Sequence, residues 1–200
     1  TIDVLINNAG GVFPRQKTSA DEFEMTFAVN HLGHFALTTS LLDILLPSKA
    51  RVINVSSEAH RTGKLKIENL KPSNSYRSWG AYGTAKLCNI YFTTELHRRF
   101  ASEGLTSYAL HPGVVNTHFF TPFKGIIGFL IRTFSFLLIS PEKGAETQIF
   151  LATAPDLKEQ SGEYFKNKKV KKPSSQARNS AAAKKLWEVS EQYLKEGGTK

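Results

Sequence analysis

Short β-rich runs alternate with much longer helical patterns along this chain, and this alternation constrains the fold more than any other feature. Three runs rich in Val, Ile, Leu and Tyr predict buried strands at residues 2–6, 51–56 and 106–111. Continuous apolar runs are typical of parallel strands that are covered on both faces. The sequence therefore predicts an α/β fold with a parallel sheet in βαβαβ order, connected by right-handed crossovers.

Two long helices are expected between these strands. Residues 19–22 have the sequence of a capping box, and apolar residues recur at helical spacing over residues 23–47, which predicts one long crossover helix. A second helix is predicted from Trp79 to about Glu103, with Cys88 among the residues of its apolar side. We interpret Cys88 as a core residue rather than a nucleophile.

The C-terminal part continues the pattern. Residues 140–142 combine a cap residue, a proline and an early acid, which predicts the start of another helix. Its apolar face is expected to include the following residues: Ala145, Ile149, Phe150 and Ala152. A short strand at 162–165, a basic loop and a terminal helix from about Asn179 to Leu194 complete the predicted elements.

Composition narrows the class of protein. The 200 residues are 40% hydrophobic and 22% charged, which excludes a disordered or collagen-like chain and predicts one domain over residues 1–200. The single cysteine excludes an internal disulfide and a multi-cysteine zinc site, and it fits a reducing, intracellular compartment. His31 and His34 have the spacing of metal ligands, but no third ligand is evident, so we expect no metal site and a packing or capping role for both.

The positive charge is concentrated near the C-terminus. Residues 158–200 carry 11 Lys and Arg against 5 acids, out of a net charge of +9 for the whole chain. The lysines cluster at the following positions: Lys166, Lys168, Lys169, Lys171 and Lys172. They could bind phosphate on an anionic membrane or remain a solvated loop. Because no aromatic platform or recognition motif flanks them, nucleic-acid binding is not predicted.

The longest apolar stretch covers residues 125–140. It has 16 residues and contains Arg132, whereas about 20 apolar residues are needed to span a bilayer. Two interpretations remain, an ordinary buried helix and an apolar helix that lies on a membrane or covers an apolar substrate pocket.

Tyr82 and Lys86 form the most informative pair in the chain. Residues four apart on a helix share a face, so the Lys86 ammonium can lie beside the Tyr82 phenol. A free tyrosine has a pKa near 10, and acid/base work at neutral pH would require it to fall by roughly 3 units. A nearby buried cation favours the phenolate in that way. Taken alone, the pair is weak evidence for catalysis, because a tyrosine and a lysine four residues apart on a helix often occur by chance.

The ends of the predicted strands strengthen this signal. The three strands are followed by Asn7-Asn8-Ala9-Gly10, by Ser56-Ser57 and by Pro112-Gly113. Ligands bind at the carboxyl ends of strands in open parallel sheets. The sequence therefore predicts a polar binding rim beside the helix that carries Tyr82 and Lys86.

At this point the chain resembles the short-chain dehydrogenases/reductases. The family's elements occur in its order: Asn7-Asn8-Ala9-Gly10, Asn30, Ser57, Tyr82-x-x-x-Lys86, and Pro112-Gly113 with Thr117. Residues 30–35, 55–60, 111–115 and 161–165 look like the retinol dehydrogenase-like subgroup. The resemblance covers essentially the whole chain and implies a Rossmann-like, doubly wound parallel sheet.

The resemblance also implies roles for particular residues. Tyr82 would be the general acid/base, Lys86 would lower its pKa and bind the nicotinamide ribose, Ser57 would hold the substrate oxygen, and Asn30 would support a proton relay through water. The expected cofactor-binding residues are Asn8, Ala9, Gly10, Tyr82, Lys86, Pro112, Gly113 and Thr117. Ser57 is chosen over Ser56, although the 24 residues between Ser57 and Tyr82 exceed the family's common spacing.

A further departure concerns the beginning of the chain. It opens inside a strand, and the glycine-rich phosphate-binding turn of the family does not occur in it. We expect a chain that lacks the first βαβαβ portion of the fold and carries the catalytic half only. Residues 2–6 would then form an exposed apolar edge, so the 200-residue chain alone is expected to be inactive and poorly soluble.

Together these features predict an NAD(P)-dependent oxidoreductase that interconverts an alcohol and a carbonyl on a lipophilic substrate. By resemblance NADP is favoured over NAD, and homo-oligomers and attachment to the endoplasmic reticulum membrane are possible. Two alternatives belong to other classes: a non-catalytic truncated binding module, and a basic protein bound peripherally to membranes.

Overall fold

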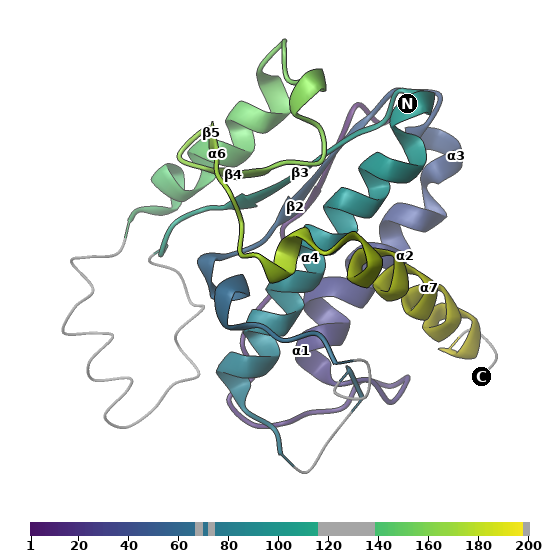
Figure 1. Ribbon diagram of the computed structural model, residues 1–200, viewed down its shortest axis with the longest axis vertical. Coiled ribbons are helices and arrows are strands. Elements are labelled where there is room, and N and C mark those ends of the chain that lie inside the picture. The colour runs from purple at the N-terminus through teal and green to yellow at the C-terminus, as the bar shows by residue number, and fades with distance from the viewer. Residues whose placement is uncertain (67–69, 72–74, 116–138, 198–200) are drawn as a thin grey trace.

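The computed structural model describes residues 1–66, 70–71, 75–115 and 139–197 (Figure 1). It contains a five-stranded sheet in the order β1-β2-β3-β4-β5. The strands are β1 (Val4–Asn7), β2 (Arg51–Val55), β3 (Thr106–His111), β4 (Tyr164–Lys166) and β5 (Lys169–Val170). The first four are parallel to their neighbours, and β5 is antiparallel to β4. The predicted α/β fold with a mostly parallel sheet is confirmed.

Helices connect these strands and follow the last one. They are α1 (Met25–Phe27), a π-helical segment (Ala28–Leu32), α2 (Gly33–Ser40), α3 (Leu42–Leu45), α4 (Ser78–Phe100), α6 (Pro141–Thr153) and α7 (Ser180–Gly197). Short 3₁₀ turns occur at Glu58–Thr62, Ala101–Glu103, Lys158–Gln160 and Gln176–Arg178. The predicted helix after Trp79 and the cap at Ser140, whose Oγ accepts from the Lys143 N–H at 3.3 Å, are both confirmed.

The first predicted helix was wrong in its start and its continuity. Glu22 has φ of 65°, in the left-handed region, so residues 19–22 form a turn instead of a capping box. The helix begins after Glu24, whose buried carboxylate accepts from the backbone N–H groups of Thr26 at 2.8 Å and Phe27 at 2.9 Å. Apolar spacing cannot distinguish these starts, because a carboxylate can cap the first N–H groups of a helix as a serine can.

Each face of the sheet is covered, as the apolar strands predict. Val52 packs against α4 in a cluster with Phe92, whereas its neighbour Ile53 packs in another cluster with Leu110 and Leu151. Leu151 belongs to α6, so α6 covers the face opposite to α4 (Figure 1). Successive residues of a strand point to opposite faces, which explains why both Val52 and Ile53 are fully buried.

The placement of α6 also reverses the hand of one connection. Strands β1 to β4 follow one another across the sheet in chain order. The helix between β2 and β3 lies on one face and the helix between β3 and β4 on the other. The connection from β3 to β4 therefore has the opposite hand to the one before it, an exception to the right-handed rule.

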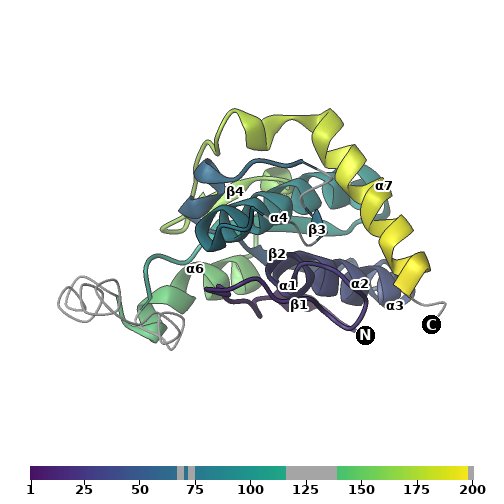
Figure 2. The same cartoon turned by 90° about the horizontal axis from the view of Figure 1, so that it is seen from below.

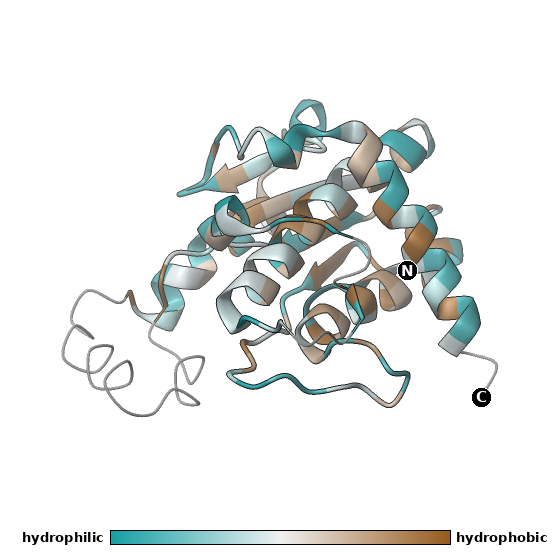
Figure 3. Cartoon of the chain, turned by 60° about the horizontal axis from the view of Figure 1, so that its bottom comes forward, coloured by the Kyte–Doolittle hydropathy of each residue, from teal (hydrophilic) through white to brown (hydrophobic). Residues whose placement is uncertain are grey.

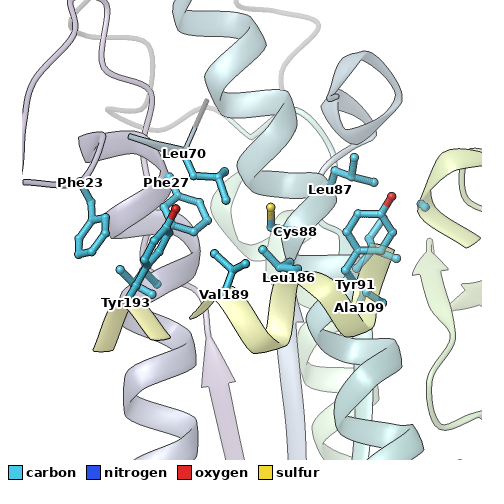
Figure 4. Packing of buried hydrophobic residues seen from close by; sticks show 14 of the residues in the cluster. Phe23, Phe27, Leu70, Leu87, Cys88, Tyr91, Ala109, Leu186, Val189 and Tyr193 are labelled. Carbon is cyan, nitrogen blue, oxygen red and sulfur yellow. The ribbon is translucent and has the colours of Figure 1, made fainter. Parts of the chain in front are cut away.

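Helix α7 packs along the outer side of α4 (Figures 1 and 2). Hydrophilic and hydrophobic positions alternate along α7 in Figure 3, as expected for a helix with one buried face. That face contacts α4 and α1 through the buried side chains drawn in Figure 4, where Leu186, Val189 and Tyr193 meet Phe27 and Cys88. Cys88 is fully buried there, which confirms its expected core position.

The predicted apolar face of α6 was wrong in part. Its buried residues are Gly144, Thr147 and Leu151, which lie along one stripe of the helix at i, i+3 and i+7. Ile149 is 57% exposed. Leu151 of this stripe packs into the cluster that covers the sheet, and a Cβ on Gly144 would collide with Val115, so the stripe that faces the protein is not the one with the most apolar residues.

The predicted basic loop is instead the hairpin of β4 and β5. Asn167 and Lys168 have φ of 52° and 60°, the left-handed values that a two-residue type I′ turn requires. Lys168 Nζ lies 3.0 Å from a Glu146 carboxylate oxygen, and Lys166 Nζ lies 3.9 Å from Glu58. The basic run therefore includes strand residues and two lysines that face acids.

Strand β1 lies at one edge of the sheet and pairs with β2 alone among the described residues. Ile6 is 40% exposed on it, as the sequence predicts for an apolar edge. Within the described ranges no helix is both long and apolar enough to cross a membrane. Residues 125–138 of the apolar stretch lie outside the described residues.

Candidate active site

A cleft of about 540 Å³ opens at the carboxyl ends of the parallel strands. Its walls come from the segments after β1, β2 and β3, from the first turns of α4 and from α6. The sequence predicts a rim at this place, and the described residues bring its polar groups together. Asn8, Gly10, Ser57, Tyr82 and Lys86 all line the cleft.

Tyr82 and Lys86 lie one helical turn apart on the face of α4 that borders the cleft. Both side chains are buried, Tyr82 with 7% and Lys86 with 3% of its surface exposed. Lys86 Nζ lies 5.6 Å from the centre of the Tyr82 ring and donates a hydrogen bond to the Val55 carbonyl oxygen at 2.9 Å. Asn89 Nδ2 donates to the same carbonyl at 3.1 Å. The end of β2 thus holds the lysine beside the tyrosine.

Burial dominates the protonation of both groups. It raises the pKa of Tyr82 to about 12, although a hydrogen bond with Ser57 opposes this rise. It lowers the pKa of Lys86 to about 8. The sequence predicts a lowered pKa for Tyr82, and the side chains of this chain produce the opposite direction, because desolvation of the phenolate outweighs the hydrogen bond with Ser57.

The two consecutive serines after β2 have different surroundings. Ser56 is buried, and its Oγ donates to the Lys86 carbonyl oxygen at 2.7 Å, which ties β2 to the backbone of α4. Ser57 is half-buried, forms a side-chain hydrogen bond with Tyr82, and accepts from the Ala59 N–H at 3.2 Å. These contacts support the choice of Ser57 over Ser56 as the residue that faces the reacting group.

Two glycines bring the Ser57 turn close to α4. A Cβ on Gly63 would collide with the Gly83 carbonyl oxygen, and a Cβ on Gly83 would lie 2.7 Å from the Ala59 carbonyl oxygen. Only a residue without a side chain allows such an approach between two backbones. Because Gly83 follows Tyr82 directly, this contact sets the distance between Ser57 and Tyr82.

Asn30 lies behind the cleft wall and is fully buried in the π-helical segment. Its Nδ2 donates to the carbonyl oxygens of Gly11 at 2.9 Å and Thr26 at 2.8 Å, and its Oδ1 accepts from the Gly11 N–H at 3.2 Å. A Cβ on Gly10 would collide with Asn30 Oδ1 and lie 3.4 Å from Lys86 Nζ. Asn30 therefore fixes the loop after β1 directly against the lysine.

The remaining predicted cofactor residues divide into three groups. Asn8, Pro112 and Gly113 line the cleft, and Gly113 has φ of 100°, a value that favours glycine. Ala9 is exposed and is not among the cleft-lining residues. Thr117 lies outside the described residues.

Several cleft residues were missed by reasoning from the sequence. Trp79 lies one helical turn before Tyr82, with their rings 6.0 Å apart, and that spacing was the available signal. His111 ends β3 and lines the cleft, where burial lowers its pKa to about 4. Gln148 of α6 donates to Asn8 Oδ1 at 3.4 Å, a contact across 140 residues that no local pattern reveals.

The two histidines with metal-like spacing are packed side chains. Within the described part of the chain, no group of three or more His, Cys, Asp or Glu is placed to hold a metal. His31 is fully buried with Nε2 3.2 Å from Ser190 Oγ, and burial lowers its pKa to about 3. Burial and Lys86 lower the pKa of His34 to about 4. Both positions agree with the expected packing role.

Comparison with known proteins shows which family has sequences like this one. The profile of the family described as short chain dehydrogenase matches residues 1–124. Retinol dehydrogenase 12 of Mus musculus is 44% identical over 194 residues, which cover 96% of this chain and 61% of that protein. The chain spans about 60% of the length of the curated relatives it matches.

Solved structures show the same fold. A protein from Mycobacterium paratuberculosis is 32% identical with a TM-score of 0.72, over 96% of this chain and 67% of that one. An NADPH-bound carbonyl reductase from chicken fatty liver is 20% identical with a TM-score of 0.57, over 82% of this chain and 62% of that one. The similarity to the carbonyl reductase supports the fold alone.

Proposed function

Because this chain belongs to the short-chain dehydrogenase family, we propose that it carries the catalytic part of a nicotinamide-dependent oxidoreductase that interconverts an alcohol and a carbonyl. The observation that carries the proposal is the meeting of Ser57, Tyr82 and Lys86 on the wall of one cleft. They come from two elements that are adjacent only in the folded chain, after β2 and on α4.

The cleft has groups that fit a nicotinamide cofactor. Lys86 Nζ uses one of its three N–H groups on Val55, which leaves donors for ribose hydroxyls. Gly10 and Gly113 present backbone without a side chain to the cleft, where a Cβ on Gly113 would collide with Ile139. The cofactor, when bound, supplies or accepts the hydride.

The chain's own residues then handle the substrate oxygen. Ser57 and Tyr82 share a hydrogen bond, so an oxygen that enters between them meets two hydroxyl groups. Tyr82 with a raised pKa stays a neutral phenol at pH 7, the form that donates a proton to a developing alkoxide. The Lys86 ammonium, with a pKa of about 8, remains mostly charged at that pH and stabilises the phenolate left behind. These protonation states suit proton donation to the substrate oxygen, the step that carbonyl reduction requires.

An apolar substrate fits the remaining walls. Trp79, Val114, Val115, Pro141 and Ala145 line the cleft beside the polar groups. Sites of this kind bind through apolar contact area and orient the ligand with few polar groups. The 44% identical relative is named a retinol dehydrogenase, and we propose retinaldehyde-like or other lipophilic carbonyls as substrates. From the resemblance to the retinol dehydrogenase-like subgroup we also propose NADP in preference to NAD.

The test is turnover by the natural protein that contains these residues. NADPH and NADH oxidation are followed with a retinoid and a steroid carbonyl, beside Tyr82→Phe and Lys86→Ala. We expect Tyr82→Phe to lower kcat at least 100-fold while the Kd of the cofactor stays within threefold of the wild-type value. Lys86→Ala should lower kcat and also weaken cofactor binding. Tyr91→Phe is the matched control, because Tyr91 lies on the same helix and its hydroxyl donates to Gln176 O at 2.8 Å.

Full turnover by Tyr82→Phe would refute the assigned roles. If cofactor binds but the wild type turns over no carbonyl, the non-catalytic binding module becomes the better account of this chain.

A further inference from the structure

His60 joins the Ser57 turn to a segment near the C-terminus. It is 1% exposed in the 3₁₀ turn Glu58–Thr62. Its Nδ1 lies 2.6 Å from the Ser57 carbonyl oxygen, and its Nε2 lies 3.1 Å from the backbone N of Ser174, which is 114 residues away. One imidazole therefore bridges the serine of the cleft and the chain that follows β5.

The two partners determine which nitrogen carries the proton. The Ser174 N–H can only donate, so Nε2 must accept and carries no hydrogen. The Ser57 carbonyl oxygen can only accept, so Nδ1 must donate. The neutral Nδ1–H tautomer satisfies both contacts, whereas the Nε2–H tautomer would satisfy neither and the imidazolium only that with Ser57.

Other contacts hold the same turn from the same side. Tyr164 of β4 donates to Glu58 Oε1 at 2.8 Å, and its ring lies 5.1 Å from that of His60 in an edge-on arrangement. Arg61 Nη2 donates to the Lys172 carbonyl oxygen at 3.2 Å. The side chains of Glu58, His60 and Arg61 thus fasten the turn after Ser57 to β4 and to the segment after β5.

We propose that His60, as the neutral Nδ1–H tautomer, is a positioning residue that holds Ser57 against Tyr82. This inference rests on the proposed function and extends it. The Ser57 carbonyl also accepts from the His60 backbone N–H at 3.0 Å, so the imidazole supplies the second bond that fixes this peptide. On the other side the Ser57 hydroxyl meets Tyr82, and rotation of the peptide would move that hydroxyl.

The surroundings of His60 set the direction of its pH dependence. Glu58 and Arg61 belong to its own turn, His111 faces it from β3, and Lys166 of β4 lies beside Glu58. Burial lowers the pKa of His60 below 6.5, while hydrogen bonding to Ser57 opposes this shift. The neutral form is therefore present at pH 7 and through pH 6.5. Protonation at lower pH places an N–H on Nε2 opposite the Ser174 N–H and breaks that link.

Nitrogen-15 NMR of labelled histidine rings tests the tautomer without any need for turnover. We expect the His60 signals to show a protonated Nδ1 and an unprotonated Nε2 at pH 7, and to change only below pH 6.5. His60→Phe, by loss of its signals, provides the assignment. An Nε2–H tautomer, or an imidazolium at pH 7, would overturn the proposal even if the protein proves to be no oxidoreductase.

Kinetic variants test the positioning of Ser57. His60→Phe removes both bonds but keeps a ring against Tyr164, and we expect about a tenfold loss of kcat with the cofactor KM within twofold. His60→Asn keeps an amide donor near the place of Nδ1, and we expect it to recover at least a third of the lost kcat. His97→Phe is the matched control, because His97 Nδ1 lies 3.0 Å from Ser161 Oγ and is not among the residues that line the cleft.

The inference fails if folded His60→Phe keeps more than half of the wild-type kcat. It fails also if His60→Asn is no better than His60→Phe, or if His97→Phe loses as much as His60→Phe. Absence of turnover in the wild type would instead refute the proposed function and leave the NMR result to decide the tautomer.

Discussion

Replacement of Gly83 by alanine should push the Ser57 turn away from α4. The new Cβ would lie 2.7 Å from both the Ala59 carbonyl oxygen and Thr62 Oγ1, and 3.1 Å from the Gly63 backbone N. Two of these three atoms belong to the backbone, so no side-chain rotation relieves them. Overpacking of this kind costs about 1–3 kcal/mol of the free energy of unfolding.

Gly80 on the same helix provides a matched control. A Cβ there would find its nearest neighbour at 3.7 Å, an ordinary contact. Both substitutions gain up to about 1 kcal/mol from alanine's helix propensity, so this contribution largely cancels in their difference. We therefore expect Gly83→Ala to be about 1–3 kcal/mol less stable than Gly80→Ala.

Urea unfolding of both variants measures this difference, with the slope m checked for constancy. A difference below about 0.5 kcal/mol would refute the tight backbone contact between the Ser57 turn and α4. In the same samples kcat should fall for Gly83→Ala and stay near the wild type for Gly80→Ala, since only the first displaces Ser57 from Tyr82.

Three further predictions concern other parts of the chain. Lowering the pH from 7 to 5 should reduce the free energy of unfolding by about 2 kcal/mol through His31 alone, because its pKa is depressed to about 3 and the unfolded state takes up the proton first. In His31→Gln the midpoint of urea unfolding should therefore depend less steeply on pH, and an unchanged pH dependence would contradict the assignment. Glu24→Ala should cost about 1–2 kcal/mol of the free energy of unfolding in urea, because each oxygen of the carboxylate accepts one N–H. Glu24→Gln should cost about half as much, because its amide keeps only one acceptor oxygen; no loss in either variant would contradict a capping role. If the β4–β5 hairpin and the residue after it contact anionic membranes, binding to phosphatidylserine vesicles, measured by sedimentation, should weaken about fivefold with each of Lys169→Gln and Lys171→Gln and also as salt rises. Lys184→Gln on α7 is the control, and equal binding by all three variants would argue against this contact.

Features encoded by local periodicity could be predicted from the sequence. The strand at 106–111 was predicted with its observed bounds, and α4 begins within one residue of the predicted Trp79. Apolar runs and helical spacing are short-range patterns, so they can be recognised without knowledge of the fold. The cap at Ser140 was predictable for the same reason.

The candidate site was predictable as a set of residues but not as a geometry. Strand ends and the Tyr82–Lys86 spacing indicated which residues meet, because parallel strands deliver their carboxyl ends to one edge. The direction of the Tyr82 pKa was predicted wrongly, since the degree of burial depends on every segment that closes over the ring.

The sequence by itself determined the element order, the sheet type and the identity of the polar rim, because each follows from residues close together in the chain. Only the tertiary structure decided that α6 covers the opposite face, that the basic run folds into a hairpin, and that His60 reaches Ser174. Each of these depends on contacts between distant segments. Local patterns carry no information on such contacts, and packing and hydrogen-bond satisfaction select them when the chain closes.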